Sequence, residues 1–328
     1  MLRLFGQNTP VQAITLLAAM VLIWARPLAH TRPMAEAAGY APLYTPLCSL
    51  AIPPLAAAIA AMLLILLGGY CLNLMLAHTN LVPQNNILPM FLYCIYMSAT
   101  ATTLSPTLLA NLLVLPIINL LLLRGSSLTI STDKIFGAAV LISIASMVYL
   151  PMLTLLVAYL LVAVNYRLYS WRDWIVLLLG LLAPYLPLWG YHFATGTLDA
   201  SLAATASGLS NLDVRILSTD TLPAVANMLL VAVAAVSLVA LWLRLGDNPV
   251  AWQKNAVTVM LAAVSGLAML FYSRLFPVNL QFFAAPFSLC GTQMFLSVGR
   301  RRYRQRRQWQ LWTYDILLIL ILLAAIVC

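Results

Sequence analysis

Charged residues are scarce in this chain of 328 residues. Asp, Glu, Lys and Arg together make up 8% of it, against about 25% in soluble globular domains. Hydrophobic residues make up 63%, and the mean hydropathy is +0.98. So few charges would leave apolar surface uncovered in water, which excludes an ordinary soluble fold. We expect an all-α, polytopic membrane protein, because helices satisfy their own backbone hydrogen bonds in lipid.

Acidic residues are especially rare, with eight Asp and Glu in total. None of them lies in the middle of an apolar run. Proton- and sodium-coupled transporters normally place carboxylates inside the membrane, so this absence argues against that class.

Motifs for metals, cofactors and covalent catalysis are also missing. The five cysteines form no Cys-x-x-Cys pair, and the three histidines share no ligand spacing. The chain has no Gly-x-Gly-x-x-Gly, no Walker motif and no nucleophilic serine elbow. We therefore expect no metal and no cofactor, and cysteines that are buried as small hydrophobic side chains.

Long apolar runs dominate the sequence. A spanning helix needs about 20 apolar residues, and the chain offers eleven candidate runs, which leave no room for a separate soluble domain. We expect residues 1–328 to form a single integral membrane domain. The runs are Val11–Ala25, Leu50–Ala77, Ile87–Leu104, Pro106–Leu123, Ile135–Leu150, Pro151–Asn165, Trp174–Ala194, Leu222–Leu243, Asn255–Tyr272, Phe276–Val298 and Leu311–Cys328.

Six arginines are concentrated between the last two runs. They are Arg300, Arg301, Arg302, Arg304, Arg306 and Arg307. Moving six guanidinium groups across a bilayer is prohibitive, so we expect the loop 299–310 to stay in the cytoplasm and to orient the chain. Contact with anionic lipid is an alternative use of the cluster. Nucleic acid is a weaker one, and we expect no such partner.

The remaining basic residues test this orientation. Alternating eleven helices back from the arginine loop places 13 of the 17 basic residues on the cytoplasmic side. We therefore expect the N-terminus inside and the C-terminus outside, with external loops at 26–48 and 195–221.

Three patterns predict local structure. Tyr149-Leu150-Pro151 has no polar spacer, so the helices on either side should meet in a tight turn with Pro151 at a first helical position. The run Phe276–Val298 is rich in amides and hydroxyls and should face protein or a cavity. Asn111 and Asn119 share a helix face, where they would form hydrogen bonds between helices or line a groove for a headgroup.

Candidate chemistry gathers in the external segments. The loop 26–48 carries Glu36, the only glutamate, which is placed to act as general base on a hydroxyl acceptor. Arginines would hold the phosphates of a lipid-linked donor. The predicted substrate-binding residues are Tyr40, Tyr44, Arg215, Arg274, Asn279 and Gln281. In the plainer alternative Glu36 is a solvated loop residue, and Asp199, Asp213 and Asp220 are turn and cap residues.

Six stretches carry a family resemblance. They are Met1-Leu-Arg-Leu-Phe-Gly-Gln-Asn-Thr-Pro10, Ala41-Pro-Leu-Tyr-Thr-Pro46, Leu104-Ser-Pro-Thr-Leu-Leu-Ala-Asn-Leu112, Lys134-Ile-Phe-Gly-Ala-Ala139, Tyr149-Leu-Pro151 and Trp171-Arg-Asp-Trp174. Together they resemble an uncharacterised inner-membrane family found in Bacteroidota, over most of residues 1–200. The resemblance implies a topology and a compartment, the bacterial inner membrane, and no mechanism.

A more distant similarity concerns the hairpin from Lys134 to Tyr166 and the proline-containing helix with Pro184 and Pro187 that follows it. These resemble the middle of the GT-C membrane glycosyltransferases, which implies a GT-C-like arrangement and a polyprenyl-phosphate-linked substrate. Those enzymes carry an essential acidic residue in a first external loop, where only Glu36 is available here.

These features lead to one expected function and two alternatives. We expect a multi-pass inner-membrane protein of cell-envelope glycan or glycolipid handling, either a polyprenyl-phosphate-dependent glycosyltransferase or a non-catalytic relative. Its partners would be membrane lipid and that lipid-linked substrate. The alternatives are a transporter or flippase for a lipid or envelope precursor, and a non-catalytic scaffold subunit of an envelope complex.

Overall fold

The computed structural model describes residues 10–35, 40–50, 52–77, 79, 81, 87–99, 101–123, 130–166, 170–210, 221–270, 280–297 and 306–327. Within these ranges the chain is helical and contains no strand. The predicted all-α class is therefore confirmed for the part of the chain that the structure describes.

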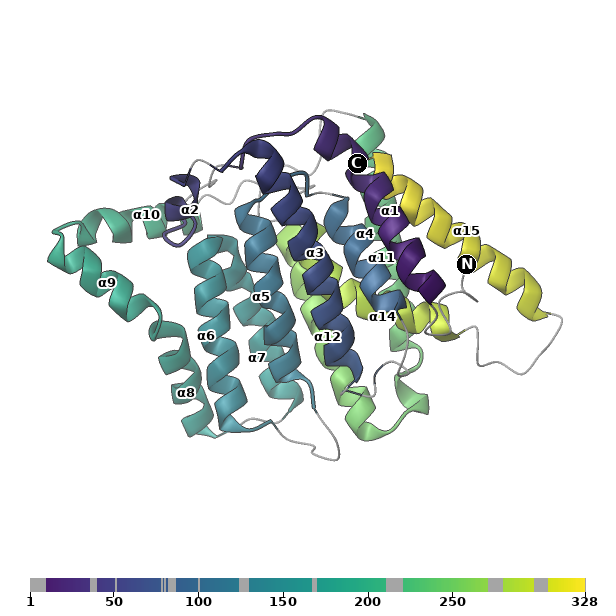
Figure 1. The fold of residues 1–328 in the computed structure, drawn as a ribbon. Helices are drawn as coiled ribbons and strands as arrows, with labels where there is room; N and C mark the ends of the chain where they lie inside the picture. The colour runs from purple at the N-terminus through teal and green to yellow at the C-terminus, as the bar shows by residue number, and fades with distance from the viewer. Residues whose placement is uncertain are drawn as a thin grey trace.

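The described elements are all helices (Figure 1). They are α1 (Pro10–Ala29), α2 (Thr45–Cys48), α3 (Pro54–Ala77), α4 (Leu88–Ser98), α5 (Pro106–Leu121), α6 (Thr132–Val148), η2 (Leu150–Thr154), α7 (Leu155–Asn165), α8 (Trp171–Leu182), α9 (Tyr185–Ala194), α10 (Leu198–Ser210), α11 (Thr221–Trp242), η3 (Leu245–Asp247), α12 (Val250–Leu270), η4 (Leu280–Phe283), α14 (Ala284–Ser297) and α15 (Arg306–Val327).

Two of the described helices are long and apolar enough to cross a membrane, over Gln12–Ala29 and Pro54–Leu76. Helices α8 and α9 meet the same criteria as a pair that is bent by 42°, so they add a third span if they cross as one unit. Shorter apolar helices cover Leu88–Ser98, Pro106–Leu121, Leu150–Asn165, Met228–Trp242 and Asp315–Ile326. The predicted total of eleven spans and the GT-C-like arrangement stay predictions.

All eleven predicted runs contain helix, but several boundaries were wrong. The run Trp174–Ala194 is two helices, because Pro184 and Pro187 lack the N–H groups that would continue one helix. The predicted external loop 195–221 contains α10. The last helix begins at Arg306, inside the predicted loop 299–310. Arg306 and Arg307 therefore belong to the first turn of α15, whereas Arg300, Arg301, Arg302 and Arg304 lie outside the described residues.

Most of the described helices share one core. A single cluster of buried hydrophobic residues extends from α1 to α15. Helix α5 lies in the centre of the bundle (Figure 1), where it contacts α3, α6 and α12. At the contact of α6 with α8, a Cβ atom added to Gly180 would stand 2.7 Å from the Ala139 Cβ atom and 3.0 Å from the Phe136 carbonyl oxygen. Glycine is required there because the two helices approach so closely.

The tight turn between α6 and η2 is confirmed. Tyr149 is the one extended residue between the two elements, and Pro151 occupies one of the first two positions of η2. Pro151 fits there because the N–H group that it lacks would have no helical partner at the start of a helix.

The amide-rich run 276–298 lies inside the bundle where it is described. Element η4 contacts α4, α5, α11, α12 and α14. Ser288 and Thr292 are fully buried, and their hydroxyls donate to carbonyl oxygens of their own helix at 2.7 Å and 2.6 Å. Interior placement is therefore confirmed for residues 284–295, and Asn279 lies outside the described residues.

A polar cluster joins the end of α5 to the start of α12. The buried Asn255 side chain accepts a hydrogen bond from the Leu123 N–H at 2.7 Å and donates to the Leu123 carbonyl at 3.0 Å. Thr258 donates to the Tyr166 hydroxyl at 2.9 Å, and that hydroxyl lies 3.4 Å from Asn255 Oδ1. Asn255 thus satisfies both backbone groups of a residue just past a helix end.

Candidate functional site

Helices α8, α9 and α10 form an arch at one side of the bundle. Figure 1 shows α9 slanting away from α6, with α10 returning toward the core. Helix α8 packs on α6, α9 has no buried residue, and α10 contacts η2. The turn into α10 uses Gly196, whose φ of +70° is a conformation that favours glycine. The arch therefore starts and ends on the bundle and departs from it along α9.

Two serines of α6 hold the bend between α8 and α9. The Ser143 hydroxyl donates to the Leu181 carbonyl at 2.8 Å. The hydroxyls of Ser146 and Tyr185 lie 2.7 Å apart. A helix break leaves carbonyl groups without their usual partners, and Ser143 supplies a donor for one of them. The bend is thus fixed by side-chain hydrogen bonds.

Under the arch lies a group of half-buried aromatic and polar side chains, which we call the arch cluster. It comprises Tyr40, Tyr185, Trp189, His192 and the buried Ser201. The Tyr40 hydroxyl is 3.4 Å from His192 Nε2 and forms a hydrogen bond with Ser201. Burial raises the pKa of Tyr40, and the bond with Ser201 lowers it in part. Residues far apart in the sequence therefore meet at Tyr40.

The His192 ring is oriented by its second nitrogen. His192 Nδ1 lies 2.8 Å from the Thr197 hydroxyl, which lies 2.8 Å from the hydroxyl of Thr195. With Nδ1 bonded to Thr197, Nε2 faces Tyr40 and can accept a hydrogen bond from a hydroxyl. The rings of Tyr185 and Trp189 stand 5.7 Å apart with an interplanar angle of 38°. The arch cluster combines an imidazole, hydroxyls and aromatic faces.

Tyr44 was predicted to bind substrate, but the structure buries it completely. Its hydroxyl donates to the Ala35 carbonyl at 2.5 Å and lies 3.4 Å from the Leu104 carbonyl. Burial raises the pKa of Tyr44, so the hydroxyl keeps its proton as a donor. Tyr44 thus links Ala35 to Leu104, just before α5, and has no surface to offer a ligand.

Gln281 is also deep in the bundle, at 1% exposed. Its backbone carbonyl accepts a hydrogen bond from Asn111 Nδ2, which confirms the predicted bonding between helices at Asn111. Among the described residues, neither polar atom of the Gln281 side chain has a partner, and Asn111 Oδ1 has none either. Gln281 and Asn111 therefore carry buried polar atoms that are unpaired in the described structure.

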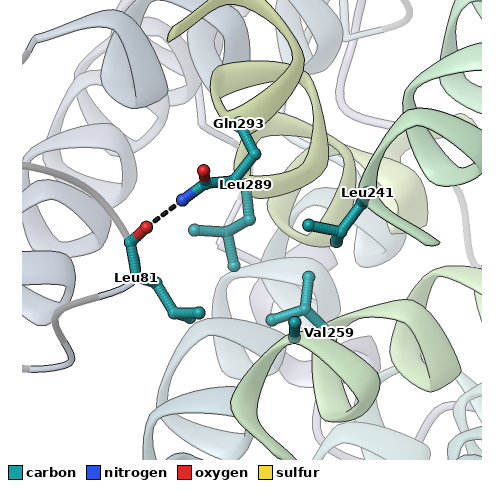
Figure 2. Close-up of a pocket in the computed structure, with 6 residues that line it drawn as sticks. Leu81, Leu241, Val259, Leu289 and Gln293 are labelled. Atoms are coloured by element: carbon teal, nitrogen blue, oxygen red, sulfur yellow. Dashed lines mark hydrogen bonds between the residues drawn. The ribbon is translucent and has the colours of Figure 1, made fainter. Parts of the chain in front are cut away.

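Figure 2 shows a small cavity between α11, α12 and α14. It is lined by Leu81, Leu241, Ala256, Val259, Leu289 and Gln293, with a volume of about 10 Å³. Gln293 Nε2 donates to the Leu81 carbonyl, so its amide bridges to the segment after α3. The space is about that of one water molecule, which excludes a substrate in this conformation.

The other predicted site residues are not placed. Glu36, Arg215, Arg274 and Asn279 lie outside the described residues. Cys94 and Cys290 are buried as expected, but Cys48 and Cys71 are exposed. Cys71 lies with Leu67, Tyr70 and Leu74 on the outward face of α3. The prediction that Cys71 is buried was therefore wrong.

Four residues of the arch cluster were not predicted from the sequence: His192, Tyr185, Trp189 and Ser201. The segment Tyr185-Leu-Pro-Leu-Trp-Gly-Tyr-His-Phe193 holds five aromatic or imidazole rings in nine residues, and this density could have pointed to the site. Because the run Trp174–Ala194 was predicted to be a single membrane helix, these residues were not predicted to form a site.

No group of three or more potential metal ligands occurs among the described residues. Comparison with known proteins found no matching family model, no similar curated protein and no similar solved structure.

Proposed function

We propose that this chain is a multi-pass protein of the bacterial inner membrane, with about eleven helices, the N-terminus inside and the C-terminus outside. The charge distribution supports this orientation, since 13 of the 17 basic residues then face the cytoplasm. The long apolar helices α1 and α3 support insertion. The resemblance to an inner-membrane family of Bacteroidota belongs to this proposal, as does a GT-C-like arrangement.

Within this membrane, we propose a role in handling a cell-envelope glycan or glycolipid that arrives on a polyprenyl phosphate. The observation that carries the proposal is the arch cluster, where Tyr40 meets His192 of α9 and Ser201 of α10. Half-buried aromatic rings with a few hydrogen-bonding groups are typical of sites that bind amphipathic small molecules. In the proposed orientation this cluster lies at the external face.

The two ends of the short segment around Glu36 are both held in place. The Ala35 N–H donates to the Leu104 carbonyl at 3.2 Å, and the Ala35 carbonyl accepts from Tyr44. Tyr40 contacts His192. Four residues of chain span at most about 14 Å, so the Cα atom of Glu36 is within that distance of the Tyr40 Cα atom. In this proposal Glu36 serves as general base beside the arch cluster, with Arg215 or Arg274 on the phosphate.

The test is the substitution Glu36→Gln, which keeps the shape and removes the base. We expect assembly of the envelope glycan to fall by about 100-fold or more, the usual contribution of a general base, while the protein accumulates normally. Asp199→Asn removes an exposed carboxylate in the first turn of α10 and should leave assembly unchanged. Normal assembly in the Glu36→Gln variant would rule out this catalytic role.

A flippase is the second candidate, favoured by the broken helix pair α8–α9 and by the unpartnered amide of Gln281. Transporters often use discontinuous helices around a site in the middle of the membrane. In that case Glu36→Gln would leave activity intact, and the purified protein would carry a lipid-linked precursor that mass spectrometry identifies. A scaffold would carry no such precursor.

A further inference from the structure

We propose that the arch cluster binds the uncharged sugar ring of a lipid-linked glycan, with Tyr185 and Trp189 against the ring and Tyr40 and His192 on its hydroxyls. This inference rests on the proposed function and names the part of the substrate that this site recognises.

The side chains of the arch cluster can be reached by a ligand, and a ligand could replace the contact between Tyr40 and His192. Tyr40, Tyr185, Trp189 and His192 are all half-buried, so part of each side chain can reach a ligand. The 3.4 Å between the Tyr40 hydroxyl and His192 Nε2 is beyond the usual hydrogen-bond range. A sugar hydroxyl placed between these two groups would form shorter bonds to both.

The absence of fixed charge in the cluster selects the ligand class. Its five side chains include no carboxylate, ammonium or guanidinium group. All of the buried polar residues in the described part of the chain are also uncharged. A phosphate would require a fixed cation, whereas a sugar offers a partly apolar ring and several hydroxyls. Aromatic faces with a few hydrogen-bonding groups match a sugar ring and its hydroxyls.

The orientation of His192 adds hydrogen-bond specificity. When Nδ1–H donates to Thr197, 2.8 Å away, Nε2 is left as an acceptor for a ligand hydroxyl. The Tyr40 hydroxyl can then accept from or donate to a neighbouring hydroxyl. A site built in this way rejects a ligand without hydroxyl groups, because its half-buried polar atoms would be left unpaired.

Exposed apolar side chains on α8 and α9 suit the lipid part of the ligand. Leu178, Leu179, Leu182 and Leu186 on α8 and α9 are 43% to 61% exposed. These four side chains lie on the same bent helix pair, α8 and α9, that carries Tyr185, Trp189 and His192. Acyl or prenyl chains would cover this surface while the ring occupies the cluster.

The experiment is a binding titration by native mass spectrometry of the full chain in a zwitterionic detergent that contains no sugar. The probes are monoglucosyldiacylglycerol and diacylglycerol, which differ only in the sugar. We expect the glucosyl lipid to bind preferentially and methyl glucoside at high concentration to compete with it. Trp189→Leu and His192→Gln should each weaken binding of the glucosyl lipid by roughly five- to tenfold, the effect of one lost contact.

Matched controls exist for both substitutions. Trp171→Leu and His30→Gln make the same changes at exposed positions outside the cluster and should bind like the unchanged protein. Tyr40→Phe repeats the test with the loss of a single hydroxyl if either cluster variant fails to fold, as judged by elution volume and helical circular dichroism.

Equal binding of the two lipids, or unchanged binding in the cluster variants, would overturn the inference. Equally tight binding of methyl glucoside alone would overturn its lipid-linked part. Both outcomes are separate from the test of Glu36, which measures glycan assembly. A Glu36→Gln variant that fails in assembly while the cluster shows no preference for sugar would reject this inference and keep the proposed function.

Discussion

At the scale of single residues, Gln281 of η4 is buried and Gln293 of α14 is half-buried, and their side chains differ in what they contact. The Gln293 amide donates to the Leu81 carbonyl. The Gln281 amide is buried with neither polar atom paired in the described structure. A buried amide without partners costs about 1 to 3 kcal/mol, so the same substitution should have opposite effects at these positions.

Gln281→Met keeps the approximate volume and removes the unpaired atoms, so we expect the free energy of unfolding to rise by about 1 kcal/mol. Gln293→Met removes a donor that has a partner, so the free energy of unfolding should fall by about 1 kcal/mol. Thermal unfolding of both variants in the same detergent measures the difference. A loss of stability in the Gln281→Met variant would show that the native amide has a partner, such as a bound water.

At the scale of elements, the packing of α6 against α8 depends on the missing side chain of Gly180. Gly180→Ala would force its Cβ atom against Ala139 and the Phe136 carbonyl. Overpacking of this kind costs about 1 to 3 kcal/mol, and a lowered unfolding temperature should report it. Gly190→Ala in α9 is the control, because nothing lies within 4 Å of the added atom. The unfolding temperature of the Gly190→Ala variant should be unchanged or slightly higher, since alanine favours helix.

The junction of α5 with α12 should depend on the hydrogen bonds of the Asn255 side chain. Asn255→Ala leaves the N–H and carbonyl groups of Leu123 without their partner, at a cost of about 2 to 4 kcal/mol. Asn248→Ala removes one local bond, to the Arg244 carbonyl four residues earlier, and should cost about 1 kcal/mol or less. Equal effects of the two substitutions in an unfolding assay would contradict this role of Asn255.

At the scale of the whole molecule, the proposed orientation can be read from cysteine accessibility. Starting from a variant that lacks the five natural cysteines, we expect a membrane-impermeant maleimide to label Asp213→Cys in intact cells. Gln305→Cys should react only after the membrane is permeabilised. Restoring Cys48, which is exposed at the end of α2, provides a second external reporter. Labelling of the Gln305→Cys variant in intact cells would reverse the orientation.

The class of the molecule and the positions of most helices follow from the sequence alone. Apolar runs separated by prolines and charges identify helices directly, because a helix satisfies its backbone within its own segment. The tight turn at Tyr149–Pro151 and the buried run around Ser288 and Thr292 could be predicted for the same reason: each depends on neighbours in the chain or on a strong preference between lipid and protein.

Tertiary structure alone decided the candidate site. Hydropathy treats residues 174–194 as one apolar stretch, so the bend at Pro184 and the departure of α9 from the bundle were not predicted. The contact of Tyr40 with His192 joins residues 152 positions apart. Tyr44 was predicted to bind substrate, and its burial depends on carbonyl groups at Ala35 and Leu104. Such contacts arise from how helices pack in three dimensions, and no local pattern in the chain encodes them.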